Sequence, residues 1–298
     1  IEAAQAADRC MLQEYCSYAE GRMTLRKNPE SGMIDKPRET TAGFTAFCRA
    51  KVIGPTGFLW GDGNGKITAG NGSLDNPQPN AFSLVEIDDC PGATSICREA
   101  CYVHGIRKYS PETHDLYFHN SRKIREVLAG GYPDEWAAIF ADHISRHCAG
   151  GFRWHVSGDV FSLAYAQWIA RVCMNSSDVR HWIYTRSFQY IGALHGIRNL
   201  TLNLSCDVEN YPEAKAAHAQ FPQTRLCFLT REGDVPPDLD DGSVIFPDYQ
   251  LRGGNEAGQI WFGGLSPQYK SFVCPVDFHG KAENRRCGPC DRCLVQLR

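Results

Sequence analysis

The 298-residue sequence lacks long apolar runs and a strong charge of either sign. No stretch of eighteen apolar residues occurs, so we expect no membrane-spanning helix. The N-terminus, IEAAQAADRCMLQEY, does not have the basic-then-apolar layout of a signal peptide. The formal net charge of -3 disfavours strong non-specific binding to DNA, but it is compatible with a nucleotide or a flipped base in a pocket. Together these absences predict a cytoplasmic protein.

Common nucleotide-binding fingerprints are missing as well. No dinucleotide glycine motif follows any predicted strand. The segment 54–80 contains GDGNGK, but Ile67 follows the lysine where a phosphate loop needs Ser or Thr, and no glutamate closes a calcium loop from Asp62. We interpret this segment as a hairpin or long loop. The ten histidines are scattered, and we predict no two-histidine metal spacing on a helix.

Cysteine, by contrast, is abundant, and seven of the fourteen cysteines form two groups with metal-ligand spacing. Disulfide-dense proteins are usually small and spread their cysteines through loops, so metal binding in a reducing compartment is favoured. A three-cysteine site leaves one metal position open, whereas a four-cysteine site can be closed. The groups are Cys90, Cys97 and Cys101 in CPGATSICREACY, and Cys274, Cys287, Cys290 and Cys293, which end in CGPCDRC.

The nature of the metal is less constrained. Three soft thiolates suit an iron–sulfur cluster or zinc, and a zinc site would need a fourth ligand such as His104 or His155. In the second group, two residues separate each of the last three cysteines and twelve separate Cys274 from Cys287, a pattern that favours a [4Fe–4S] cluster over the separated pairs more common at structural zinc. Two further cysteines in apolar stretches, Cys173 and Cys227, are predicted to be buried hydrophobic residues.

From residue 81 the apolar pattern alternates between strand and helix. This alternation predicts a parallel sheet with helical crossovers, an α/β fold that forms a partial or closed (β/α) barrel of mostly parallel strands. The predicted strands are 82–88, 152–158, 181–187, 200–207, 224–230, 243–248 and 258–264, and the predicted helices are 113–129, 134–148, 160–174, 188–195 and 211–220.

The same pattern predicts three regions. Residues 1–80 form an N-terminal helical and hairpin extension, and residues 81–264 form the barrel with the first cysteine loop. Residues 265–298 form a C-terminal cysteine-rich segment that binds the second cluster.

Polar residues follow several of the predicted strands. Because active sites of parallel α/β folds gather at the carboxyl ends of strands, we expect these residues to surround the same mouth as the first cysteine group. Such a lining suits a cofactor with an amino acid end, a ribose and a charged centre. The alternative is that they only cap helices. The candidates are Ser157, Gly158, Asp159, Arg186, Ser205 and Asp207.

These features resemble known families. A strand, a three-cysteine loop, an aromatic residue after the last cysteine (Tyr102) and repeated β/α units resemble the radical S-adenosylmethionine (radical SAM) enzymes. Their usual motif has three and two residues between the cysteines, against six and three here. CPGATSICREACY, HVSGDVFS, YTRS, LSCD and CP…CGPCDRC are also similar to the phage-encoded gene product 88 domain family over roughly residues 80–298. That family implies little about substrate.

The radical SAM resemblance implies specific roles. The first three cysteines would hold a [4Fe–4S] cluster whose open iron binds S-adenosylmethionine, and one electron would give a 5′-deoxyadenosyl radical. The C-terminal cysteines resemble an auxiliary cluster, so two clusters are expected. Ser157, Gly158 and Asp159 stand where the superfamily contacts the methionine amine, and Ser205 and Asp207 stand where it often contacts ribose.

The resemblance also implies partners. These are an electron donor such as flavodoxin or ferredoxin, a small-molecule, nucleotide or nucleic-acid substrate, and the host cytoplasm if the protein is phage-encoded. It names no catalytic residue.

Two other functions fit the same residues. One is a zinc-stabilised barrel enzyme that acts on a nucleobase through Asp159, Asp207 or Asp248. The other is a non-catalytic iron–sulfur protein for electron transfer or sensing. A colourless protein would indicate the first, and clusters without binding of S-adenosylmethionine would indicate the second.

Overall fold

A six-stranded parallel sheet organises the chain. The computed structural model describes residues 51–52, 56–60, 80–86, 88–104, 111–131, 133–148, 150–231, 233–251, 253, 255–279, 290 and 292–293. Every strand of this sheet pairs in parallel with the next one along the chain, so all carboxyl ends lie at one edge. The strands are β3 (Ala81–Phe82), β4 (Phe152–Trp154), β5 (His181–Thr185), β6 (Leu200–Cys206), β7 (Arg225–Thr230) and β8 (Val244–Pro247).

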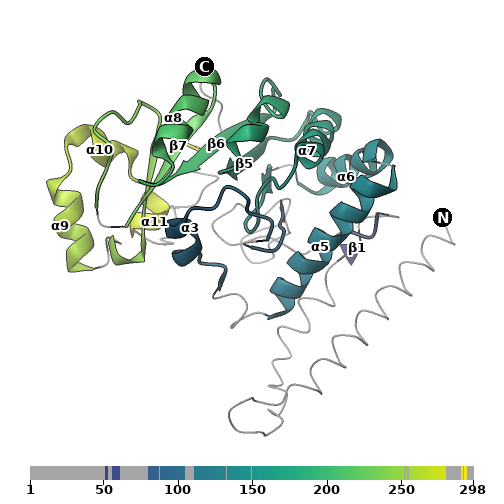
Figure 1. Cartoon of the computed structure of the whole chain (residues 1–298), viewed down its shortest axis with the longest axis horizontal. Coiled ribbons are helices and arrows are strands. Elements are labelled where there is room, and N and C mark those ends of the chain that lie inside the picture. Colours follow the sequence, from purple (N-terminus) through teal and green to yellow (C-terminus); the bar gives the residue numbers. More distant parts are fainter. Residues whose placement is uncertain are drawn as a thin grey trace, which may run out of the picture.

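Helices connect most of these strands, as the alternating pattern predicts, whereas no helix is assigned between β7 and β8 in the described residues (Figure 1). In the described part of the chain, β3 and β8 are the edge strands, and β1 (Lys51–Val52) and β2 (Leu59–Trp60) form a separate antiparallel pair. The helices are α3 (Ser95–Glu99), α5 (Pro111–Gly130), α6 (Pro133–His147), α7 (Leu163–Asn175), α8 (Tyr211–Gln220), α9 (Glu256–Gly264), α10 (Pro267–Phe272) and α11 (Pro275–His279), with 3-10 turns η2 (Phe188–Ala193) and η3 (Tyr249–Leu251).

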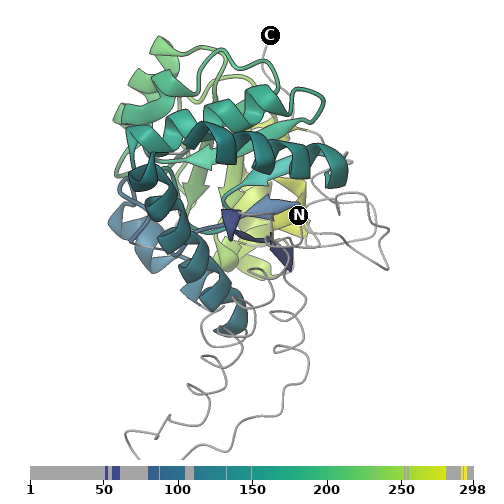
Figure 2. The ribbon, with the colours of Figure 1, turned by 90° about the vertical axis from the view of Figure 1, so that its right-hand side faces the viewer.

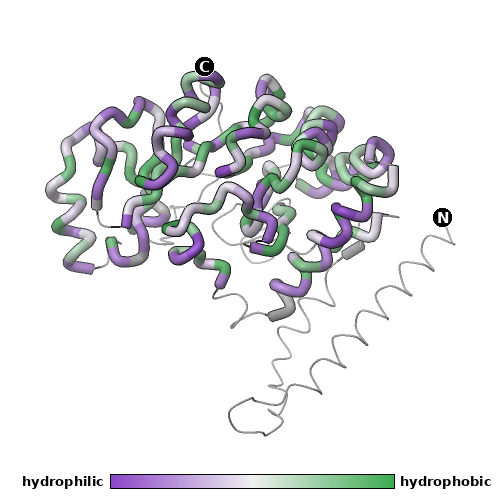
Figure 3. Tube along the Cα trace, viewed as in Figure 1, coloured by the Kyte–Doolittle hydropathy of each residue, from purple (hydrophilic) through white to green (hydrophobic). Residues whose placement is uncertain are grey.

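One face of the sheet carries the main core. Helices α6, α7 and α8 lie across it, as Figure 2 shows. The centre of this core is aromatic: Phe140 of α6 stacks on Trp154 of β4 at 5.9 Å between ring centroids, and Trp168 of α7 meets both rings edge-on. Green and purple alternate along α5 and α6 in Figure 3, because each helix presents an apolar stripe to the core and a polar one to solvent.

The opposite face of the sheet is covered by C-terminal residues. Cys293 packs on Tyr184 and Cys227, and its carbonyl oxygen accepts a hydrogen bond from Asn203 Nδ2 at 3.1 Å. Cys274 joins the same cluster because its N–H donates to the carbonyl of Ile245 in β8 at 2.8 Å. Cover on both faces explains why six of the seven residues of β6 are buried, as is typical of parallel strands.

The predicted strand at 258–264 is wrong, because this segment is the helix α9. Asn255 caps it by accepting a hydrogen bond from the N–H of Gly258 at 2.7 Å, and an acidic residue in the first turn complements the helix dipole. The apolar run misled the prediction, since only one side of it is covered: Trp261 packs on Phe278, whereas Ile260 is 69% exposed.

Two further predicted strands are shorter than expected. Leu84 N–H still donates to the carbonyl of Ser157 at 2.9 Å, but the next N–H, that of Val85, donates to the side-chain Oγ of Ser121 at 2.8 Å, so β3 does not extend to residue 88. Strand β4 ends at Trp154 because His155 adopts a left-handed conformation with φ of 60°. In the described part of the chain, none of the helices has both the length and the apolar character to cross a membrane.

Acid should destabilise this fold through two buried histidines. Burial lowers the pKa of His155 and of His181 to about 3. Between about pH 6.5, where an unfolded histidine titrates, and pH 3, only the unfolded chain takes up these protons. The free energy of unfolding should therefore fall as the pH is lowered, by about 2 kcal/mol per histidine at pH 5. Urea unfolding between pH 7 and pH 5 measures how the free energy of unfolding changes with pH. If His181→Gln shows the same pH dependence as the wild type, His181 is not a source of it.

Candidate functional site

The first cysteine group lies on the loop that follows β3 and contains α3. This loop packs directly on the chain after β5: a Cβ added at Gly92 would lie 2.1 Å from the carbonyl oxygen of Arg186. Only glycine allows so close an approach of two backbones. The cysteine loop is therefore held against the carboxyl ends of the strands, as predicted for an α/β site.

Thr94 links the cysteine helix to the sheet. It is the N-cap of α3, and its Oγ1 accepts a hydrogen bond from the N–H of Cys97 at 3.0 Å. The same hydroxyl donates to Asp207 Oδ2 at 2.6 Å. One side chain thus satisfies a free helical N–H and fixes the helix to the residue that follows β6.

A buried ion pair lies under this contact. Arg186 Nη1 donates to Asp207 Oδ2 at 2.7 Å and to Asn210 Oδ1 at 3.3 Å. The two charged side chains are only 9% and 1% exposed. The Arg186 guanidinium also lies close to the Cys97 thiol and opposes the rise of its pKa. Predicted site residues from two different strands therefore meet beneath the cysteine loop, as expected.

Asp159 binds the loop that follows β5. Its carboxylate accepts hydrogen bonds from Val160 N–H at 2.7 Å, Arg186 N–H at 2.8 Å and Ser187 Oγ at 3.2 Å. Burial raises the pKa of Asp159, although these bonds and one from Thr185 oppose the shift. Because its oxygens are engaged by the protein, Asp159 holds the loop after β5 in place and thereby orients Arg186.

The other predicted residues occupy different environments. Gly158 has φ of +79°, and a Cβ there would lie 2.6 Å from Leu84 Cβ, so this turn requires glycine. Ser157 is buried, and its Oγ has no hydrogen-bond partner among the described residues. Ser205 is half-buried within β6, in register with Cys227 and below the strand end. It does not belong to the cluster around Arg186.

Cys97 lies beside the ion pair, but the three thiols of the first group do not converge on one point in the described structure. Cys90, Cys97 and Cys101 are half-buried and are not joined in disulfide bonds. Burial raises the pKa of the Cys97 and Cys101 thiols, and the nearby Arg186 guanidinium opposes this at Cys97. Across the described residues, no three His, Cys, Asp or Glu side chains come together closely enough to hold a metal ion. The structure places the loop that carries these thiols at the strand ends, and metal binding stays a prediction.

The second cysteine group is divided. Cys274 is buried, Cys290 is exposed and Cys293 is half-buried, whereas Cys287 lies outside the described residues. The hydrogen bond with Cys227 lowers the pKa of Cys293 to about 7, helped by Tyr184 and nearby arginines. Cys227 is buried as predicted, but its thiol faces Cys293 and lies outside the main helical core.

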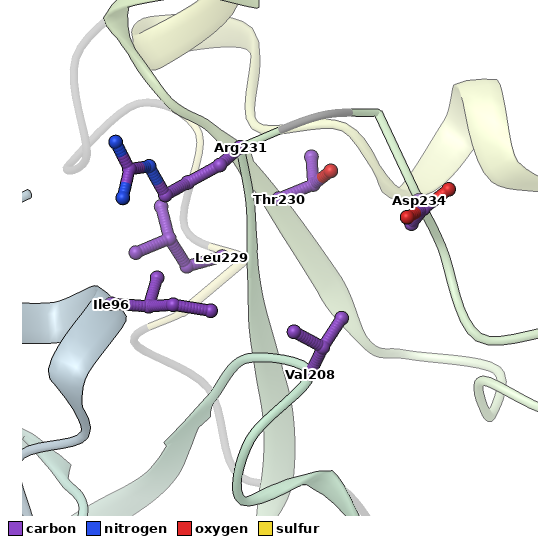
Figure 4. A pocket seen from close by; sticks show the side chains of 6 residues that line it. All are labelled: Ile96, Val208, Leu229, Thr230, Arg231 and Asp234. Carbon is purple, nitrogen blue, oxygen red and sulfur yellow. The ribbon is translucent and has the colours of Figure 1, made fainter.

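A small cavity of about 160 Å³ adjoins the cysteine helix (Figure 4). It lies between α3 and the carboxyl ends of β6 and β7, with mostly apolar walls and a few polar groups. Arg231 at its rim is held by ion pairs with Glu99 of α3 at 2.8 Å and with Asp248 at 3.5 Å. The cavity is lined by Ile96, Val208, Leu229, Thr230, Arg231 and Asp234.

Comparison with known proteins identifies the family. The family profile described as Gene product 88 matches residues 58–296. The chain belongs to the gene product 88 family. A relative, the gene 88 protein of Mycobacterium phage D29, is 30% identical over 159 residues, which cover 51% of this chain and 63% of the relative. The chain therefore matches less than two thirds of that relative's length. No solved structure matches the chain.

The expected resemblance to this family is thus confirmed, whereas membership of the radical SAM superfamily stays a prediction. Sequence reasoning about this gene product 88 protein missed two features. Thr94 carries an available signal, a threonine directly before a short helix. The prediction that no two histidines share metal spacing on a helix is wrong, because His143 and His147 are four residues apart on α6.

Removing the Thr94 hydroxyl should loosen the cysteine helix. Thr94→Val loses both the cap and the bond to Asp207, so we expect about 1–2 kcal/mol less stability. Alkylation of Cys97, followed by peptide mass spectrometry, should become faster. Thr94→Ser retains the hydroxyl and should behave as the wild type. Equal alkylation rates in Thr94→Val and Thr94→Ser would contradict the linking role.

Breaking the buried ion pair between Arg186 and Asp207 should destabilise the fold more than the loss of the Thr94 hydroxyl. Arg186→Met leaves the Asp207 carboxylate buried without its cation, which we expect to cost about 3–5 kcal/mol in urea unfolding. The double variant Arg186→Met, Asp207→Asn removes the stranded charge and should recover part of the loss. If the double variant loses as much free energy of unfolding as the Arg186→Met and Asp207→Asn variants lose in sum, the two side chains act independently.

Proposed function

We propose that this gene product 88 protein is an iron–sulfur enzyme of the radical SAM type, which reductively cleaves S-adenosylmethionine to modify a small molecule or a nucleotide. The observation that supports this most is the position of the three-cysteine loop. It follows the first strand of a parallel sheet whose strands pair in chain order, and it lies over the ends of the later strands. We further propose that this sheet is a partial (β/α) barrel, with the site at its mouth.

The residues fit the proposed cluster in donor type and location. Three thiols on one segment are the donor set of a [4Fe–4S] cluster with one open iron, although binding requires them to turn toward a common point. When bound, such a cluster supplies the electron that cleaves the sulfonium of S-adenosylmethionine.

The chain's own residues have defined tasks in this proposal. Thr94 and the Arg186–Asp207 pair hold the cysteine loop in place. The Arg186 guanidinium favours the thiolate form of Cys97, which is the form that binds metal. Asp159 orients Arg186 through its backbone N–H.

The cavity beside α3 supplies a place for the rest of the ligand. Ile96, Val208 and Leu229 offer an apolar surface to a flat ring, and Thr230 and Asp234 offer a hydroxyl and a carboxylate to polar edges. This combination suits a nucleoside, in which an apolar face is bordered by hydrogen-bonding groups. The cavity adjoins the helix that carries Cys97, as a cofactor bound at the open iron requires.

We propose that the C-terminal cysteines form an accessory metal site, either iron–sulfur or zinc. Cys274 and Cys293 both pack on the sheet face that carries Cys227, so this site would adjoin the inside of the proposed barrel. A small electron-transfer protein, such as a flavodoxin or ferredoxin, would deliver the electron to the protein.

Anaerobic purification tests this function directly. We expect a brown protein with about eight irons, or about four if the accessory site holds zinc. Reductant and S-adenosylmethionine should yield methionine and 5′-deoxyadenosine, detected by chromatography. Cys97→Ser should lose about four irons and the cleavage activity. Cys173→Ser, which changes a buried thiol in the helical core, is the matched control and should keep both. A colourless protein with stoichiometric zinc would overturn the proposal.

A further inference from the structure

Two histidines form a pair far from the cysteine loop. His143 and His147 lie on successive turns of α6, so both project from the same side of the helix. Their ring centroids are 4.6 Å apart. Because α6 leads into β4, its last turn lies at the amino ends of the strands, at the edge opposite the candidate site. The pair is therefore separate from the first cysteine group.

Trp60 holds the two imidazoles together. Its ring lies 4.3 Å from that of His143 and 5.2 Å from that of His147, between centroids. The indole is 2% exposed and sits at the end of β2, so it is a fixed support. A pair of rings already confined in this way loses little conformational entropy when a ligand binds between them.

The end of the helix also favours a cation. His147 is the last residue of α6, where the unpaired carbonyl groups give the helix a partial negative charge. The neighbouring cation, Arg146, is paired with Asp142 one turn earlier. Its positive charge is therefore largely offset near the imidazoles.

We propose that His143 and His147 bind a divalent transition-metal ion of the nickel, copper or zinc class. Imidazole nitrogens suit these ions, and histidines four residues apart on a helix chelate a single ion from one face. Water completes the coordination, because two protein ligands leave positions open. The proposal is independent of the iron–sulfur function, since it uses no cysteine.

Nickel titration of the full-length protein tests this site. Wild type should bind one more equivalent of Ni²⁺ in equilibrium dialysis than either His143→Gln or His147→Gln, with binding at that site weakened at least about tenfold in each variant. The cysteines are unchanged in all three proteins, so any binding to thiols cancels in the comparison. His218→Gln changes a half-buried histidine on α8 and should retain wild-type binding. Circular dichroism verifies that the variants are folded.

Tryptophan fluorescence locates the ion. Bound Ni²⁺ should quench the emission of Trp60, so titration quenches wild type, whereas Trp60→Phe binds the same equivalent with less quenching. The proposal is overturned if the histidine variants keep the wild-type stoichiometry and affinity. It is also overturned if quenching in Trp60→Phe equals that of wild type, because the ion would then lie elsewhere.

Discussion

The buried pair of Arg186 and Asp207 is the interaction on which the candidate site depends. Each residue follows a different strand, β5 or β6, and the ion pair joins the two strand ends. Neither charge is solvated, so each needs the other and the hydrogen bonds around it. Thr94 extends this contact to the cysteine helix, and Asp159 fixes the backbone of Arg186. The loop with the three thiols is thereby positioned by charge and hydrogen bonding more than by apolar packing.

The two faces of the sheet have different tasks. Helices cover one face with a core of interlocking aromatic rings, which supplies the apolar burial that stabilises the fold. C-terminal residues cover the other face with thiols, a tyrosine and a buried amide, as in the contacts of Cys293 with Tyr184, Cys227 and Asn203. Segments distant in sequence therefore meet on this second face, where Asn203 donates to the carbonyl of Cys293.

The two proposed sites lie at opposite edges of the sheet. At the carboxyl edge, glycine at positions 92 and 158 lets two loops approach the sheet closely, and a left-handed His155 ends β4 early. These local deviations bring polar groups to the mouth of the sheet. At the amino edge, His143 and His147 rest on Trp60 in a regular helix end. Function at either edge would leave the strands between them undisturbed.

The order of the helices and strands could be read from the sequence. The alternation of apolar periods predicted all six parallel strands and the helices α5 to α8, because each period reports which sides of an element are buried. It failed at α9, where Ile260, Trp261 and Phe262 form an apolar run in a helix covered on one side, and it overextended β3 and β4. Strand ends depend on which group accepts each N–H, and those acceptors, such as Ser121, are distant in sequence.

For the site, the sequence determined the residue types and the edge at which they gather. Arg186, Asp207 and the cysteine loop meet as the strand-end rule predicts. Four features follow from the three-dimensional packing alone: Asp159 bonds to the protein, Ser205 lies apart, Cys227 faces Cys293, and Trp60 contacts two histidines. Such contacts link residues far apart in the chain. Side-chain direction and backbone packing create them, and the local pattern of the sequence records neither.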